Sequence, residues 1–324
     1  MKPQRLFFLV VILAGLGAAF LLPEIQKKKT PLPDPNGLDY YLNAANLLNT
    51  RQPSVELTNV DVIRTHLASN QETLRQLHLG LGFHCVVPPE HCVNFPPSDL
   101  PLLKRLSLLL RAEGDLALAE KRTHDAVKAY LDGIRFGQEV SRGVLIYDLV
   151  GISFEFNAMT ALLQSRNQLN EADRTFLLDQ LSILRTNREP FSAVSEREMT
   201  LMRLNRRGMM DALAAPILWY KTRPAFKKTE DKGFQNIARL ELLRTDLVLR
   251  QFHERNQRWP ANLSDLKLNP SPIDPYSQNR SELRYAPEGA AYLLYSLGPD
   301  RKDDGGDSMK DVRLESKFLG RSNQ

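Results

Sequence analysis

Apolar side chains recur with the spacing of an α-helix through most of the chain. Between residues 38 and 48 they fall at i, i+3, i+4, i+7 and i+10, the pattern of a helix with one buried face: Leu38, Tyr41, Leu42, Ala45 and Leu48. The same spacing, together with capping residues, predicts further helices over residues 60–79, from Leu100 onward, and over 145–164, 171–184, 193–213 and 235–255. The middle of the chain is therefore expected to be entirely helical.

Beyond residue 256 the pattern changes to short apolar runs separated by prolines and turn residues. One of these runs, residues 291–297, is expected to be a β-strand. The change in composition predicts two folded parts, a helical domain over residues 38–232 and a smaller C-terminal module over 233–311, followed by a tail over 312–324.

The N-terminus has the pattern of a membrane segment. Lys2 and Arg5 precede seventeen uncharged residues, 6–22, which as a helix would be about 26 Å long, the lower limit for spanning a bilayer. A cleaved signal peptide is the alternative, with a small-residue site at 17–19. Because the apolar run continues to Leu22, we expect residues 1–30 to be an uncleaved anchor and the proline-punctuated residues 31–37 to be a stalk.

Most of the positive charge belongs to this N-terminal segment. The formal net charge of the chain is +5, and residues 1–30 account for +4 of it through five basic residues and Glu24. In a second basic stretch, residues 201–232, the aromatic residues are not interleaved with the charges as stacking platforms for bases would require. We therefore expect no nucleic-acid partner. Because basic residues flank the apolar run on both sides, charge alone does not set its orientation.

Two cysteines, each preceded by a histidine, lie in the segment FHCVVPPEHCVNF. His84, Cys85, His91 and Cys92 are the side-chain types that zinc prefers, but the spacing departs from common structural zinc sites. In an exported protein a Cys85–Cys92 disulfide is the simpler expectation, with free thiols and a zinc site as alternatives. Two cysteines that can form a disulfide are typical of an exported protein. We therefore expect the chain after residue 31 to lie outside the cytoplasm, in a periplasmic or extracellular location.

The stretch GDLALAEKRTHDAVKAYLDGI, within residues 110–138, resembles a single tetratricopeptide hairpin. Gly114, Ala117, Ala126 and Tyr130 stand at its small and aromatic positions. No second copy follows at the repeat period, so we expect an α-helical bundle rather than a solenoid.

A longer series of motifs occupies residues 236–307. A helix leads to Trp259-Pro260, a DPYS turn follows at 274–277, and YSLGPD follows at 295–300. In this order the motifs resemble the C-terminal module of the major pseudopilins of type II secretion systems. The resemblance implies a small α+β module with a short antiparallel sheet and a calcium loop.

In the resembling family calcium is bound by the leucine carbonyl and the aspartate of this motif and by later acidic residues. These positions correspond to Leu297, Asp300, and then Asp304 or Asp307, with Gly305-Gly306 allowing the loop to bend. The alternative is an acidic, solvated tail balanced by neighbouring basic residues.

The chain departs from a pseudopilin at its N-terminus, which has no leader peptide or phenylalanine-rich helix, so we do not expect it to polymerise. No G-x-S-x-G, H-E-x-x-H or glycine-rich phosphate motif occurs in the sequence. The expected fold is mainly α, with an N-terminal transmembrane helix, a helical bundle and the C-terminal module. The expected function is that of a non-catalytic, membrane-anchored envelope protein that binds other envelope or secretion components. A metal-dependent or hydrolase-like enzyme using the two His-Cys pairs remains the alternative.

Overall fold

The computed structural model describes residues 31–49, 59–93, 97–205 and 209–314, with only the backbone described over 209–221. The expected membrane anchor, residues 1–30, lies outside this part of the chain. The chain forms two compact units, Met1–Leu32 and Pro33–Gln324, and the described helices and strands belong to the second unit.

The described chain is mainly helical and ends in a two-stranded sheet. Its helices are α2 (Gly37–Leu47), α3 (Val60–Ala68), α4 (Gln71–Gly80), α5 (Leu100–Ala119), α6 (Thr123–Val140), α7 (Leu145–Ser165), α8 (Glu171–Asn187), α9 (Phe191–Leu204) and α10 (Met209–Asn256). Short 3-10 helices are η1 (Pro89–Cys92), η2 (Arg166–Gln168) and η3 (Leu263–Leu266), and the strands are β1 (Arg284–Glu288) and β2 (Ala291–Tyr295).

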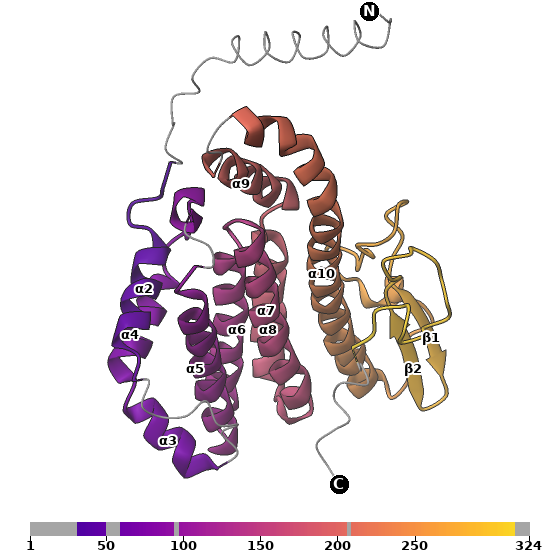
Figure 1. Cartoon of the computed structure of the whole chain (residues 1–324). Helices are drawn as coiled ribbons and strands as arrows, with labels where there is room; N and C mark the ends of the chain where they lie inside the picture. The colour runs from indigo at the N-terminus through magenta and orange to yellow at the C-terminus, as the bar shows by residue number, and fades with distance from the viewer. Residues whose placement is uncertain (1–30, 50–58, 94–96, 206–208, 315–324) are drawn as a thin grey trace, which may run out of the picture. The chain divides into compact units, whose positions relative to one another are not determined.

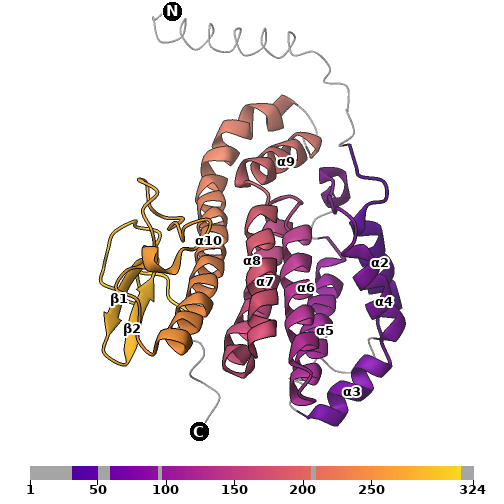
Figure 2. The same ribbon diagram turned by 180° about the vertical axis from the view of Figure 1, so that it is seen from behind.

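Helices that lie close to one another along the chain also pack together. Helix α2 lies against α4, α5 against α6, and α6 against α7 (Figure 1). Helix α10 packs on α7 and α8 with one side and on the sheet with the other, so both views place it between the bundle and the strands (Figure 2). The expected helical bundle with a small C-terminal α+β part is confirmed at this level.

Most expected helices are confirmed, and three differ in an informative way. The helix expected over 193–213 ends at Leu204 as α9, and residues 209–213 belong to α10. The single helix expected over 60–79 is divided after Ala68, where the buried Asn70 accepts a hydrogen bond from the Asn49 amide (2.9 Å) and donates one to the His66 carbonyl (2.9 Å). The helix expected from residue 235 begins much earlier, at Met209. The expected domain boundary between residues 232 and 233 therefore falls inside α10.

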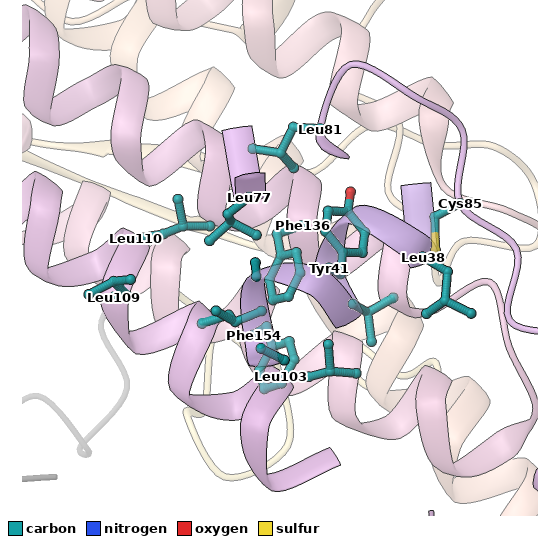
Figure 3. Packing of buried hydrophobic residues seen from close by; sticks show 14 of the residues in the cluster. Leu38, Tyr41, Leu77, Leu81, Cys85, Leu103, Leu109, Leu110, Phe136 and Phe154 are labelled. Carbon is teal, nitrogen blue, oxygen red and sulfur yellow. The ribbon is translucent and has the colours of Figure 1, made fainter. Parts of the chain in front are cut away.

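Buried apolar side chains form three clusters. The first joins α2, α4, α5, α6 and α7, and Figure 3 shows Tyr41, Phe136 and Phe154 packed within it. The second joins the α5–α6 hairpin to α7, α8 and α10, and the third lies between α10 and the C-terminal sheet. Helix α10 contributes Leu240, Leu243 and Leu247 to the second cluster and Ala238, Leu242 and Leu249 to the third.

The α5–α6 hairpin packs through the small and aromatic residues seen in its sequence. A side chain at Gly114 would come within 2.3 Å of the Tyr130 ring, so this position accepts only glycine unless the ring moves. The Tyr130 hydroxyl donates a hydrogen bond to Asp115 (2.7 Å). Ala117 and Ala126 are both buried in the second cluster.

The expected strand and antiparallel sheet are also present. Strands β1 and β2 pair in register from Arg284↔Tyr295 to Glu288↔Ala291. Gly289, with φ +60°, provides the left-handed backbone of the turn between them. Tyr285 and Tyr292 extend from the sheet into the third cluster with Trp259.

In the described part of the chain one helical segment, Leu145–Gln168, is long and apolar enough to cross a membrane, with a mean hydropathy of 1.2. The most apolar stretch of this segment is 56% buried by the rest of the folded chain. Central helices of a globular core have the same properties.

We expect Leu247→Ala to lower the free energy of unfolding by about 2–5 kcal/mol, because it leaves a cavity in the cluster that joins α10 to the bundle. Ile183→Ala on α8, at a residue that is 54% exposed, should change it by less than about 0.5 kcal/mol. Urea unfolding of the full chain in detergent measures both. Equal stability of the two variants would contradict the packing described here.

Candidate functional site

The acidic segment near the C-terminus is a loop whose two ends are held together. Ser296 and Val312 exchange backbone hydrogen bonds of 3.0 and 2.9 Å directly after β2. Gly298 lies so close to the Lys310 carbonyl that a side-chain carbon would stand 1.6 Å from its oxygen. Only glycine permits this approach, which closes residues 297–311 into one loop.

A buried carboxylate supports the start of this loop. Asp274 is 1% exposed, and its oxygens accept hydrogen bonds from the Tyr276 amide (2.9 Å), the Ser296 hydroxyl (2.7 Å) and the Leu297 amide (2.8 Å). The DPYS turn and the YSLG segment, distant in sequence, therefore meet at one side chain. In the sequence Asp274 is recognisable only as a residue of the DPYS turn, and this pattern does not predict the contact.

Asp300 and Asp307, two of the predicted calcium ligands, are exposed and satisfy local backbone turns. Each accepts a hydrogen bond from the amide two residues later, at 3.1 Å for Lys302 and 3.0 Å for Met309. Gly305 and Gly306 have φ values of +71° and +82°, so the glycine pair does provide the left-handed bend expected of it.

Asp304 and Asp311 are in a different position, because each holds one carboxylate oxygen that is buried without a hydrogen-bond partner in the described structure. The other oxygens are engaged: that of Asp304 with Lys310 (2.7 Å) and that of Asp311 with the Gly306 amide (2.7 Å). Burial raises the pKa of Asp311, and the negative charges of Asp304 and Asp303 raise it further, against the opposing effect of hydrogen bonds from the backbone of Gly306 and Asp304. The two orphaned oxygens thus belong to neighbouring carboxylates inside the closed loop.

The arrangement agrees only in part with the predicted ligands. Asp304 was predicted and Asp311 was missed, since Asp311 follows the recognisable motif and its burial arises from the closure of the loop. Among the described residues no three His, Cys, Asp or Glu side chains converge as metal ligands. The donors that lack partners are nevertheless carboxylate oxygens, the donor type that calcium prefers. Leu297, the fourth predicted residue, is buried at the base of the loop with its amide held by Asp274.

The segment containing the cysteines runs beside the start of α2. Asn36 accepts a hydrogen bond from the Val86 amide (3.0 Å) and donates one to the Val86 carbonyl (2.9 Å). In this extended conformation Cys85 and Val87 are buried, while the His84 side chain is 54% exposed. Successive side chains therefore face opposite sides.

The expected disulfide is not formed, and this prediction is corrected: Cys85 and Cys92 are both free and buried. Figure 3 shows Cys85 among the apolar side chains of the first cluster, to which Cys92, at the end of η1, also belongs. Each thiol fills space in the core. Burial raises the pKa of Cys85 well above its usual range and that of Cys92 to about 12.

The zinc alternative requires thiolates and neutral imidazoles that point to one centre. The Arg142 guanidinium instead contacts the His84 ring, 2.6 Å from Nε2, and His91 pairs with Asp99 (3.3 Å). That pairing raises the pKa of His91. The structure therefore does not bring the two His-Cys pairs together as a site.

Buried ion pairs between helices were also missed by the sequence analysis. Arg188, after α8, contacts Asp148 (3.0 Å) and Glu155 on α7, and all three residues have little or no exposed side chain. Polar residues inside an otherwise apolar helix are the sequence signal for such pairs. Because these charged side chains pair with one another, we interpret them as stabilising the packing of α8 on α7.

No protein-family model matches the chain, and neither a curated protein nor a solved structure is significantly similar to it. The functional argument therefore depends on the geometry of the residues themselves.

We expect both thiols to be unreactive in the folded chain and fully reactive once it is unfolded without reductant, because they are buried but not joined. Alkylation with a maleimide, counted by mass spectrometry before and after denaturation, measures this. If labelling of the unfolded chain requires prior reduction, the two cysteines form a disulfide in the mature protein.

Proposed function

We propose that this chain is a non-catalytic interaction protein of the cell envelope, held in the membrane by its N-terminal apolar segment and carrying a pseudopilin-like C-terminal module that is braced by calcium. One observation supports the calcium part above all others. Two neighbouring carboxylates, Asp304 and Asp311, each bury an oxygen without a partner inside a closed loop.

Charge explains why a cation belongs there. Two ionised carboxylates in a partly desolvated loop repel one another, and burial further disfavours their charged forms. The Lys310 ammonium balances the charge of Asp304 (2.7 Å), whereas no basic side chain in the described structure pairs with Asp311. Calcium takes six to eight oxygen ligands, including carboxylates, carbonyls and water. Asp304 and Asp311 would supply the charged ligands, and backbone carbonyls of the loop would supply neutral ones.

The proposal of a binding rather than a catalytic role is supported by the state of the reactive side chains. The cysteines are buried as protonated thiols, whereas nucleophilic and metal-binding cysteines act as thiolates in electropositive, accessible surroundings. His84 and His91 contact Arg142 and Asp99. No specific observation therefore favours the alternative of an enzyme at this segment.

The envelope location is supported by the sequence of residues 1–35, where a basic start, an apolar run and a proline-rich segment follow one another. In this arrangement the helical bundle and the module project from one side of the membrane. The partners are then other proteins of the envelope, secretion components included.

Calcium should raise the melting temperature of the full chain more than magnesium does, because magnesium gives up its small octahedral water shell reluctantly. An ion at a hundred times its dissociation constant adds about 2.7 kcal/mol to the stability of the unit that binds it. Thermal melting followed by circular dichroism, in calcium, magnesium or chelator, measures the effect.

Asp311→Asn tests the assignment of the ligand. The raised pKa of Asp311 means that the folded chain holds this proton more tightly than the unfolded chain, so the associated stability is present at low pH and is lost as pH rises through the folded pKa. At neutral pH in chelator the variant should therefore melt no lower than the native chain, yet it should lose the response to calcium. Asp179→Asn, at an exposed residue of α8, should respond as the native chain does. An unchanged response to calcium in Asp311→Asn would exclude this ligand.

The anchor leads to a separate expectation. If residues 1–30 span the bilayer, the native chain should stay in the membrane pellet after an alkaline carbonate wash, and a chain starting at Pro31 should be found in the soluble fraction. Release of the intact native chain by carbonate would show that it is attached only peripherally.

A further inference from the structure

A cleft of about 760 Å³ opens where the bundle meets the C-terminal module. Its walls are α7, α10 and residues 308–313, the segment that leaves the acidic loop. Val150 and Phe156 line it from α7, Lys232 and Arg239 from α10, and Met309 and Arg313 from the loop exit. Three segments distant in sequence thus enclose one concave surface.

Four basic side chains line the cleft, and one of them, Lys310, is paired with Asp304 (2.7 Å). The others are Lys232, Arg239 and Arg313, and within the described residues none of the three forms an ion pair with a carboxylate. Arg239 has one long hydrogen bond to Asn236 (3.4 Å), and Arg313 donates to the Gly306 carbonyl (3.3 Å). The acidic residue in the lining, Asp311, is engaged with the loop through Gly306.

Arg239 is the most distinctive of these cations. Its guanidinium lies 4.8 Å from the centre of the Phe156 ring, which holds its charge toward the cleft. Burial lowers the pKa of Arg239, because its charge is removed from water without a compensating carboxylate. A partly desolvated arginine without an acidic partner is suited to an external anion.

The same cleft exposes apolar surface. Phe156 is 37% exposed and Met309 is 80% exposed, which is high for residues of their size. Leu149 and Val150, which also belong to α7, are partly exposed in the lining of the cleft. A ligand that covers this surface must be apolar as well as anionic.

We propose that this cleft docks a segment of a partner protein in which apolar side chains alternate with carboxylates. The apolar groups cover Phe156 and Met309, and a carboxylate pairs with Arg239. A free phosphate would satisfy the cations but leave the apolar side chains exposed, and a flat lipid surface does not fit a site walled on three sides. This inference deepens the proposed function and rests on it, because it names the binding surface and the chemistry of the partner.

A fluorescein-labelled peptide of repeated Leu-Glu pairs is the probe, and its fluorescence anisotropy is titrated with the full chain in non-ionic detergent. Saturable binding is expected, and it should be lost when serine replaces every leucine of the peptide or lysine every glutamate. Arg239→Gln should weaken binding by about tenfold or more, since it removes a charged hydrogen-bond donor. Met309→Asp, which alters only an exposed side chain, should also weaken it.

Lys228→Gln is the matched control, because it removes one positive charge from an exposed position of α10 outside the cleft. It should bind as the native chain does. Circular dichroism melting of each variant shows whether it is folded. Equal affinities of Arg239→Gln and Lys228→Gln, or no saturable binding by the native chain, would overturn the proposal.

Two further outcomes would overturn it in favour of another ligand. Equal binding of the serine peptide, with displacement by inorganic phosphate, would indicate a simple anion site. Binding of phosphatidylglycerol vesicles without binding of the peptide would indicate a membrane-facing surface. The titration is done in calcium and in chelator: peptide binding in both, with no thermal response to calcium, would leave the docking site standing while the calcium part of the proposed function fails.

Discussion

The burial of α10 between two apolar clusters is the constraint on which the rest of the structure depends. Residues 240–247 are buried on every side, since one face packs on the bundle and the opposite face on the C-terminal sheet. A helix buried all round is normally apolar, yet this stretch contains Glu241, Arg244 and Asp246. Charges removed from water are tolerated only when they are paired and hydrogen-bonded. Glu241 is paired with Arg185 of α8 (3.1 Å) and with Arg244, whose guanidinium also donates to the Pro270 carbonyl (2.8 Å).

These pairs join the module to the bundle. Asp246 contacts Arg250 on its own helix (2.8 Å), Arg166 after α7 (3.6 Å) and the hydroxyl of Tyr292 on β2. One carboxylate therefore contacts both neighbours of α10. Removal of one partner from a buried pair leaves an uncompensated charge and typically costs about 3–5 kcal/mol, so the position of the sheet on α10 is strongly specified. The acidic loop begins at the end of β2 and the cleft lies beside α10. The ion pairs that fix the sheet on α10 therefore also fix the positions of the loop and the cleft.

The sequence predicted the features that local chemistry determines. The helix expected over 171–184 is capped by the residue before it, Asn170, through a hydrogen bond from the Asp173 amide (2.8 Å), and β2 falls within residues 291–297. The features that it missed arise from contacts between distant residues. The helix expected over 60–79 is divided because Asn70 binds the chain at Asn49, and Asp311 is a candidate ligand only because the loop closes on Ser296. Cys85 and Cys92 have a composition and spacing compatible with a disulfide, but the pattern of the segment does not reveal that each thiol fills a place in the core.

The acidic loop and the cleft share a segment of the chain, and this has a thermodynamic consequence for the two proposed ligands. Asp311 holds an orphaned oxygen in the loop and also lines the cleft, while Val312, the next residue, forms the bridge to Ser296 that closes the loop. A cation between Asp304 and Asp311 would favour the closed conformation, because it removes the repulsion that opposes closure. A partner segment that contacts residues 308–313 would favour the same conformation, because the Ser296–Val312 bridge that closes the loop also holds that wall of the cleft in place. When two ligands prefer the same conformation, each raises the affinity of the chain for the other by the same factor, whichever binds first. Calcium in this chain would then act less as a fixed brace than as a means of setting how strongly the envelope partner is held.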